Sequence, residues 1–339
     1  MAKEKTEFLI LGQGFAGTAL ALSLMNRGKS VRILASEEKA SASSLAVGLV
    51  NPVTGRRMAK TWNYEAVVPR AHAFYAAAHF QIHGREGTFL ERRPIFKALH
   101  SVEEMNFLSG KSASDGYEHL IRIQSQAELT LPLIFKHTTG WIEIMEGGRL
   151  DPVAYLSAAR AYFLNSGCLL DELFDMSVLR ILPEGYEYQG LLFSNVISAL
   201  GLNCPWAGPD LWAVKGQVFQ FTGFPDWGNA ILKTEKFAIP LGRGEVLMGS
   251  TYEREFENAQ NDAAGFSEVT ADLEPETLIN IRQVRAWSGI RPTTKDRLPV
   301  IKKQAEGLYL VNGMGTKGVS LAPYAAGRLM SMLEADGRL

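Results

Sequence analysis

Three glycines near the amino terminus have the spacing of a phosphate-binding turn. Gly12, Gly14 and Gly17 follow the apolar run 8–11 and precede the apolar run 18–25. We expect Gly12 to allow a tight turn, Gly14 to let the backbone touch a pyrophosphate, and Gly17 to let the following helix pack closely. The N-terminus of that helix would present free N–H groups and a positive dipole to the phosphates. The pattern therefore predicts a dinucleotide site between a strand and a helix.

The acidic residue that such sites use for the adenosine ribose is missing. A strand expected at 31–34 completes the βαβ unit, but Ala35 and Ser36 follow it in place of Asp or Glu. Glu37 and Glu38 come just beyond. Either Glu37 reaches back to the ribose, or Ser36 and backbone groups bind it. We favour a solvated helix start for the two glutamates.

The composition indicates an ordinary globular protein with a large core. The chain has 339 residues, of which 46% are hydrophobic, and this length suggests two domains or one large one. Its 35 Lys and Arg and 36 Asp and Glu give a net charge of −1, which offers no overall attraction to nucleic acid or to an anionic membrane. No apolar run approaches the ~20 residues of a membrane span, and residues 1–5 lead into a strand, not into a signal peptide. We expect a cytoplasmic protein.

Neither a disulfide framework nor a metal site is expected. Cys168 and Cys204 are the two cysteines, and both are interpreted as buried apolar residues. His79 and His83 have a spacing that would suit a metal, but no acidic residue lies between them.

The remaining elements show which parts of the chain belong together. Asp151 and Pro152 suit the N-cap and first position of a helix that ends near Gly167. After it, residues 178–181 and 191–193 are expected to pair as a hairpin. Further strands are expected at 168–170, 195–201, 217–221, 245–249 and 308–311, and helices at 60–83 and 322–333.

Five segments occur in the order seen in one family of flavoproteins. They are GQGFAG (12–17), SSLAVGLVNP (43–52), VISALG (196–201), SGIRPTTKDRLPVI (288–301) and VNGMGTKGVSLAPYAAGRL (311–329). The chain resembles the D-amino-acid-oxidase-type FAD-dependent oxidoreductases over nearly its whole length. Within them it is most similar to glycine oxidase and to the oxidase half of the bifunctional enzyme that makes methylaminomethyl-uridine in tRNA.

The resemblance implies an α/β fold with two interleaved domains. Residues 1–56, 150–212 and 286–339 would form a Rossmann-like FAD-binding domain, a parallel sheet with helices. Residues 57–149 and 213–285 would form an inserted α+β substrate domain on an antiparallel sheet.

FAD is the cofactor that the resemblance implies. The absence of a suitable Cys or His near the flavin loop favours non-covalent binding, and covalent attachment stays open. Gly48, Leu49, Gly315 and Thr316 would line the isoalloxazine. The full set of residues expected to bind FAD is Gly12, Gly14, Phe15, Ala16, Gly17, Ala35, Ser36, Ser44, Ala46, Gly48, Leu49, Val178, Ala199, Gly201, Gly313, Gly315, Thr316, Lys317 and Gly318.

Arg291 matches an arginine that pairs with the substrate carboxylate in glycine oxidase; the alternative is an internal ion pair. Thr316 stands where glycine oxidase has a second carboxylate-binding arginine, and the segment 315–318 resembles the GSRG of the tRNA-modifying oxidase. Lys317 is a second candidate for the substrate site. Phe237 replaces a tyrosine of glycine oxidase and, with Tyr252, belongs either to the substrate pocket or to the core.

The resemblance implies oxidation of a C–N bond of a carboxylated amine, an amino acid or an N-substituted glycine, by hydride transfer to the flavin. Oxygen or another acceptor would reoxidise it. Two alternatives stay open: a flavin oxidase that acts on a modified tRNA wobble base, although the net charge does not favour nucleic acid, and a flavin-binding protein without turnover. NAD suits the late glycine-rich turn and the interrupted domain order less well than FAD.

Overall fold

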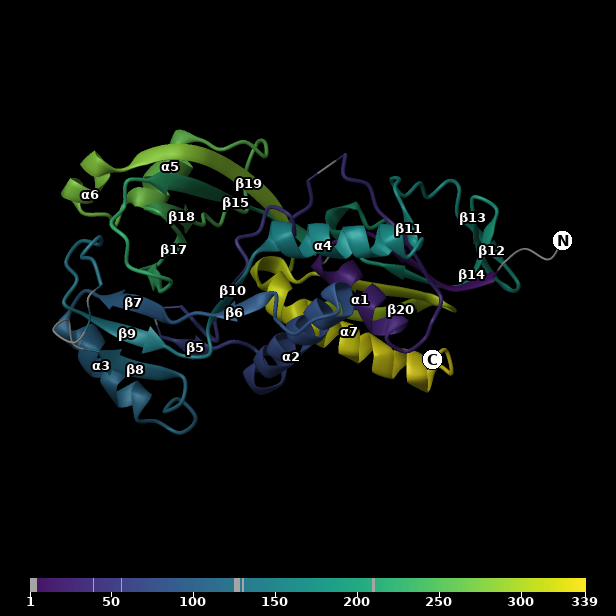
Figure 1. Ribbon diagram of the computed structural model, residues 1–339, viewed down its shortest axis with the longest axis horizontal. Helices are drawn as coiled ribbons and strands as arrows, with labels where there is room; N and C mark the ends of the chain where they lie inside the picture. Colours follow the sequence, from purple (N-terminus) through teal and green to yellow (C-terminus); the bar gives the residue numbers. More distant parts are fainter. Residues whose placement is uncertain (1–4, 39, 56, 125–128, 130, 209–210) are drawn as a thin grey trace.

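The computed structural model places two sheets side by side along the long axis of the molecule (Figure 1). The carboxyl terminus lies on the side of the first sheet. The segment 1–4 and residue 56, at which a domain boundary is predicted, lie outside the described residues. The structure describes residues 5–38, 40–55, 57–124, 129, 131–208 and 211–339.

The first sheet has a parallel centre in which five strands lie in the order β11, β2, β1, β14 and β21. Their side chains are apolar toward both faces, as expected for a sheet that is covered on both sides. Phe8 and Ile10 point to the helices, and Leu9 and Leu11 to the other face. The bounds are β1 (Lys5–Leu11), β2 (Val31–Leu34), β11 (Leu169–Leu170), β14 (Leu191–Ser198) and β21 (Leu308–Asn312), with β20 (Val300–Ala305) antiparallel to β21.

Three helices, α1, α4 and α7, cover one face of this sheet, and α2 packs on these helices. The helix predicted after Asp151 is present, and the Asp151 carboxylate accepts the N–H of Ala154 at 3.1 Å as the N-cap. The last helix begins at Gly318, four residues before the predicted start. The four are α1 (Phe15–Met25), α2 (Tyr64–His83), α4 (Pro152–Asn165) and α7 (Gly318–Ala335).

The hairpin predicted between 178–181 and 191–193 is wrong in its pairing. β12 (Arg180–Leu182) pairs with β13 (Gly185–Tyr188), which in turn pairs with the start of β14. Gln189 and Gly190 both have positive φ, at 49° and 83°, as a two-residue turn between antiparallel strands requires. This turn reverses the chain between β13 and β14.

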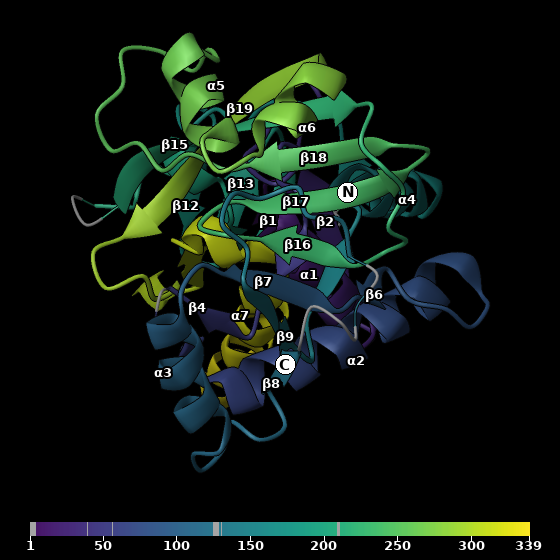
Figure 2. The ribbon, with the colours of Figure 1, turned by 90° about the vertical axis from the view of Figure 1, so that its left-hand side faces the viewer.

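The second sheet is antiparallel apart from one parallel pair, β16 with β7. Figure 2 shows it from the outer end, with α5 and α6 beside it. Phe219 and Phe221 pack with Phe266 of α5 on one face, while Ile239 and Leu247 of the other face join the core that includes the first sheet. Its order is β19 (Arg282–Thr294), β15 (Leu211–Thr222), β18 (Glu245–Gly249), β17 (Phe237–Gly242), β16 (Ile231–Lys233), β7 (Ile95–Leu99), β9 (Gly140–Ile144) and β8 (Ile121–Gln124).

These observations confirm the predicted fold class, a Rossmann-like α/β part and an α+β part on an antiparallel sheet. Both β15 and β19 cross residues at which the domain division is predicted, 213 and 286. The smaller elements are β3 (Leu49–Val50), β4 (Val53–Thr54), β5 (Ala59–Lys60), β6 (Leu90–Arg92), β10 (Gly148–Leu150), α3 (Val102–Ser112), α5 (Ala263–Thr270), α6 (Pro275–Asn280) and the 3₁₀ turns η2 (Gly201–Asn203) and η3 (Gly315–Lys317).

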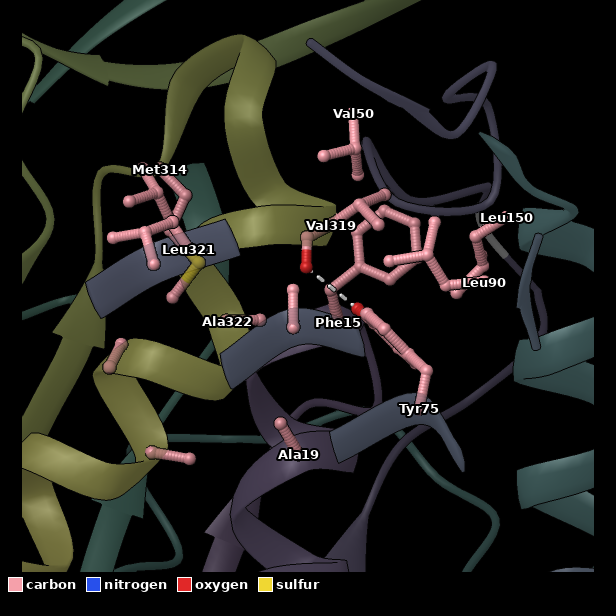
Figure 3. Packing of buried hydrophobic residues seen from close by; sticks show 14 of the residues in the cluster. Phe15, Ala19, Val50, Tyr75, Leu90, Leu150, Met314, Val319, Leu321 and Ala322 are labelled. Carbon is pink, nitrogen blue, oxygen red and sulfur yellow. Dashed lines mark hydrogen bonds between the residues drawn. The ribbon is translucent and has the colours of Figure 1, made fainter. Parts of the chain in front are cut away.

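Helix α2 falls in the predicted substrate domain but packs on the helices of the first sheet. Tyr75 of α2 is fully buried, and its ring meets that of Tyr155 edge to face at 5.2 Å. Its hydroxyl donates to the carbonyl oxygen of Val319 at 2.9 Å (Figure 3). That carbonyl lies four residues before Pro323, which has no N–H to offer it. Tyr75 therefore satisfies the carbonyl group that the proline leaves free in α7.

Candidate functional site

The glycine turn leaves no room for larger residues. Gly12 has a φ of 97°, and a Cβ atom there would lie 2.7 Å from the carbonyl oxygen of Ala199. At Gly17 a Cβ atom would lie 1.8 Å from the carbonyl oxygen of Gly12. Glycine at both positions therefore lets β1, β14 and α1 approach one another closely.

The N-terminus of α1 is open to an anion. Gly14 is the N-cap and offers no side chain, while the N–H of Phe15 donates to the hydroxyl of Ser43 at 3.1 Å. The helix carries no acidic residue in its first turn. N–H groups and a hydroxyl thus converge where a phosphate would bind.

Sequence reasoning named Ser44 and missed Ser43. The Ser44 hydroxyl accepts the N–H of Ser41 at 2.9 Å and donates to its carbonyl oxygen at 3.0 Å, so Ser44 closes the loop on itself. Ala46 is half-buried in the same loop and packs on the core. Ser43 and Ser44 are adjacent in the sequence, and nothing in it indicates which of them contacts the start of α1.

Strand ends bring most of the other expected FAD-binding residues together. The carboxyl ends of parallel strands meet at one edge of a sheet, and there β1 leads to Gly12, β2 to Ala35, β14 to Ala199, and β21 to Gly313. Ala199 donates its N–H to Leu11 at 2.8 Å. The side chain of Asn312 then joins the last two strand ends, because its amide donates to Gly201 and its oxygen accepts from Gly313, each at 2.8 Å.

At the end of β2 a buried arginine occupies the region where the ribose acid is expected. Arg160 is 6% exposed and pairs with Glu37 at 3.2 Å and with Asp171 at 2.7 Å. Its guanidinium also donates to the carbonyl oxygen of Ala35 at 3.4 Å. Glu37 therefore reaches back, but to an arginine, although its side chain is 72% exposed. The Ser36 hydroxyl accepts the N–H of Glu38 within a local turn.

Arg160 was missed by sequence reasoning. It lies four residues after Leu156 and three before Phe163, on the face of α4 that is otherwise apolar and buried. A charged residue on the apolar face of a helix was the signal in the sequence that could have identified Arg160.

The expected isoalloxazine residues come from both ends of the chain. Gly48 has a φ of 82° and packs on Leu150, with Leu49 beside it in β3. Gly315 packs on Thr293, whose buried hydroxyl has no hydrogen-bond partner within the described residues. This unsatisfied hydroxyl, which the sequence did not single out, suits a polar ligand atom.

The start of α7 meets the start of α1. A Cβ atom at Gly318 would lie 3.1 Å from the ring of Phe15. Ala16 follows in the first turn of α1, and Thr316 is exposed in η3. Val178 is placed in the turn before β12, where its N–H donates to Asp175 at 3.2 Å.

Arg291 lies on the face of β19 that looks toward this site. The same strand is fixed to the 41–48 loop by Trp287, whose ring N–H donates to the carbonyl oxygen of Leu45 at 2.9 Å. Arg291 donates to the Ser250 hydroxyl at 3.0 Å and to the Thr251 carbonyl oxygen at 3.4 Å. Burial lowers the pKa of Arg291. Within the described residues it forms no ion pair, so the alternative of an internal ion pair finds no support.

A second group of positive charges lies beside Tyr252. The guanidinium of Arg297 sits 5.9 Å from the centre of the Tyr252 ring, and Tyr252 is 40% exposed. Burial, and then the charge of Arg297, lowers the pKa of Lys317. Tyr252 is therefore a surface residue next to cations and not a core aromatic.

Phe237 is half-buried on the same face of the second sheet as Arg291. Phe237 of β17 pairs with Gly249 of β18, and Gly249 pairs with Val218 of β15. Val218 in turn pairs with Trp287 of β19. A Cβ atom at Gly249 would lie 3.3 Å from the Phe237 ring. The strand register thus gives this face an apolar wall and a charged end.

Comparison with known proteins identifies the family. The family model of FAD-dependent oxidoreductases named DAO matches residues 7–333. The chain belongs to this family. FAD is its cofactor, and the residues fit. The open helix N-terminus and the crowded Gly12 and Gly17 lie at one edge of the first sheet, and the unsatisfied Thr293 hydroxyl of β19 lies next to Gly315, which follows β21.

Two solved structures share this fold. Glycine oxidase from Geobacillus kaustophilus superposes with a TM-score of 0.80 over 98% of this chain and 95% of its own, at 19% identity. Iminodiacetate oxidase from Chelativorans sp. BNC1 gives 0.79 over 97% and 95%, also at 19% identity.

Curated relatives include the tRNA 5-methylaminomethyl-2-thiouridine biosynthesis bifunctional protein MnmC of Maricaulis maris, 28% identical over 345 residues. The match covers 96% of this chain and 51% of that protein, so the chain spans about half the length of this relative.

The remaining expectations concern the two cysteines, a metal site and a membrane span. Cys168 and Cys204 are both buried and free. The rings of His79 and His83 pack on Phe89, and no cluster of three or more His, Cys, Asp or Glu suited to a metal occurs among the described residues. None of the helices described has the length and apolarity needed to cross a membrane.

Proposed function

We propose that this flavoenzyme oxidises the C–N bond of a carboxylated amine, either an amino acid or an N-substituted glycine, and that Arg291 binds the carboxylate. The observation that carries the proposal is a half-buried guanidinium whose hydrogen-bond partners are the neutral oxygens of Ser250 and Thr251. A charge that is partly shielded from water is unfavourable unless it is paired, and Arg291 forms no ion pair within the described residues. A carboxylate that accepts two N–H groups from Arg291 would neutralise it and be held in one orientation.

Three further side chains complete the proposed substrate site. Lys317 supplies a second positive charge near the carboxylate, and Tyr252 covers the charged end. Phe237 forms an apolar wall that keeps water from the reacting carbon. Holding the amine in one orientation is a large part of the rate in such a site, so no acid or base is assigned.

FAD, when bound, accepts a hydride from the carbon that carries the nitrogen. Water then hydrolyses the substrate imine to an oxo acid and an amine or ammonia. Oxygen is the proposed electron acceptor. The names of glycine oxidase and iminodiacetate oxidase, proteins with the same fold, support this substrate class.

A second candidate is the same reaction on an amine carried by a modified tRNA base. The matching MnmC proteins support it, since they align with nearly the whole of this chain and are named for tRNA uridine biosynthesis. Thr316, in place of the second carboxylate arginine of glycine oxidase, also fits a substrate other than glycine.

The test is anaerobic mixing of the FAD-loaded enzyme with glycine, sarcosine, iminodiacetate or total tRNA, followed through the loss of visible flavin absorbance. We expect reduction by a carboxylated amine and a loss of about 100-fold in kcat/KM for Arg291→Ala. Arg282→Ala, an exposed arginine of the same strand, is the control. Reduction by Arg291→Ala at the parent rate would show that the carboxylate assignment is wrong.

Reduction by tRNA, lost after nuclease treatment, would favour the second candidate. If no amine and no tRNA reduces the flavin, the protein is better described as a flavin-binding protein without turnover. An oxygen electrode tests the acceptor.

A further inference from the structure

Three arginines from different helices line one groove on the outside of the first sheet. Arg27 follows α1, Arg70 belongs to α2, and Arg328 belongs to α7. These helices pack side by side beneath the sheet in the view of Figure 1. The groove has a volume of about 670 Å³, and we call it the arginine groove.

The charges in the arginine groove are not balanced within the described part of the chain. None of the three arginines forms an ion pair there, and Glu334 is the carboxylate among the lining residues. Among the described residues, the Arg27 guanidinium donates to one oxygen, the Ser23 carbonyl oxygen of α1, at 3.2 Å. In a chain of net charge −1, three such guanidiniums in one groove form a local positive site.

Aromatic rings lie beside these charges. The guanidinium of Arg70 sits 6.0 Å from the centre of the Tyr324 ring, which lines the groove. Trp62 meets Tyr324 edge to face at 5.5 Å and is 41% exposed. An exposed indole next to arginines offers a base a surface for stacking, while the guanidiniums face its phosphates.

We propose that the arginine groove binds the phosphates and base of a nucleotide, either free or within an RNA strand. Phosphate fits better than a lone carboxylate, because planar guanidiniums from three helices can each donate to a different oxygen. Ser331 and Asn63 add polar groups at the rim.

This site goes beyond the proposed function. The residues that line it include none of those assigned to FAD or to the amine. Flavin reduction and nucleotide binding can therefore be measured independently, and a negative result for one does not change the interpretation of the other.

The test is fluorescence anisotropy of a labelled single-stranded oligouridylate with the FAD-loaded protein at several salt concentrations. The variant Arg27→Gln/Arg328→Gln removes two exposed charges that hold no ion pair. Its matched control, Arg85→Gln/Arg282→Gln, removes two exposed arginines outside the groove. We expect the groove variant to bind at least about tenfold more weakly. Its slope of log affinity against log salt should fall by about 0.7 per arginine removed.

Trp62→Leu gives a second readout. It should weaken binding without changing the salt slope, because stacking releases no counterions. Displacement of the labelled RNA by AMP or UMP would identify a free nucleotide as the ligand, and lack of displacement would identify the strand.

The proposal is overturned if the parent protein binds neither RNA nor mononucleotide. It is also overturned if the control variant weakens binding as much as the groove variant does. Thermal unfolding and flavin content, measured on each variant, show that the fold is kept.

Discussion

The guanidinium of Arg291 lies directly over the backbone of Gly216. A Cβ atom at Gly216 would stand 1.8 Å from Nη2 of Arg291 and 2.1 Å from Nη1. The two residues lie on adjacent strands, where Val214 pairs with Arg291 and Gly216 with Gly289. The missing side chain at Gly216 thus sets the position of the proposed carboxylate-binding group.

Gly216→Ala is therefore expected to displace Arg291 and to impair substrate binding while the fold remains. The φ of Gly216 is not in the left-handed region, so alanine adds no backbone strain. Displacement by about 1 Å at such a site lowers kcat/KM by on the order of 100-fold. Gly110→Ala, at a glycine with open space around it, is the matched control. Unchanged kinetics in Gly216→Ala would contradict the proposed role of Arg291.

Gly17→Ala should yield protein that purifies with little flavin. The methyl group would collide with the carbonyl oxygen of Gly12 at 1.8 Å, so α1 must move away from the turn that we propose to hold the phosphates. The flavin-to-protein absorbance ratio after purification, and again after added FAD, measures the effect. A ratio equal to that of Gly110→Ala would count against this geometry.

The pH dependence of kcat/KM should show the titration of Lys317. Because burial, and then Arg297, lowers the pKa of Lys317, its charge is lost at a lower pH than that of an ordinary lysine. Affinity for the anionic substrate is then present below that pKa and falls as the pH rises through it.

Arg297→Gln removes the repulsion and should shift this alkaline limb to higher pH. Lys317→Met should abolish the limb. If the alkaline fall in kcat/KM occurs at the same pH in both variants, it reports the titration of a group other than Lys317.

Tyr75 and Pro323 should be coupled in stability. Tyr75→Phe leaves the buried carbonyl oxygen of Val319 without a donor, which costs about 1–3 kcal/mol. Pro323→Ala restores an N–H to α7 that can reach the same carbonyl. In that background we expect Tyr75→Phe to cost less, and urea unfolding of the four proteins measures the difference. Additive effects would mean that the hydroxyl and the proline act separately.

Local patterns were enough to predict the glycine turn and the capped helix after Asp151. In each case neighbouring residues determine the structure: glycine spacing at Gly12–Gly17, and an Asp–Pro start at α4.

Contacts between distant segments could not be predicted in the same way. Ser43 reaches the N–H of Phe15, and Thr293 lies next to Gly315, because sheets and helices bring these segments together. The hairpin error has a local cause, since the turn formed by Gln189 and Gly190 went unrecognised.

The pairing of β14 with β21 also has a consequence for biosynthesis. Val196 pairs with Leu308, and the edge that receives FAD needs both Gly12 and Gly318. On a ribosome the amino-terminal strand and helix must wait for the last strand before the cofactor edge exists. Contacts this far apart in sequence close slowly. A nascent chain therefore leaves the β21-facing edge of β14 unpaired until residues 308–312 have been made.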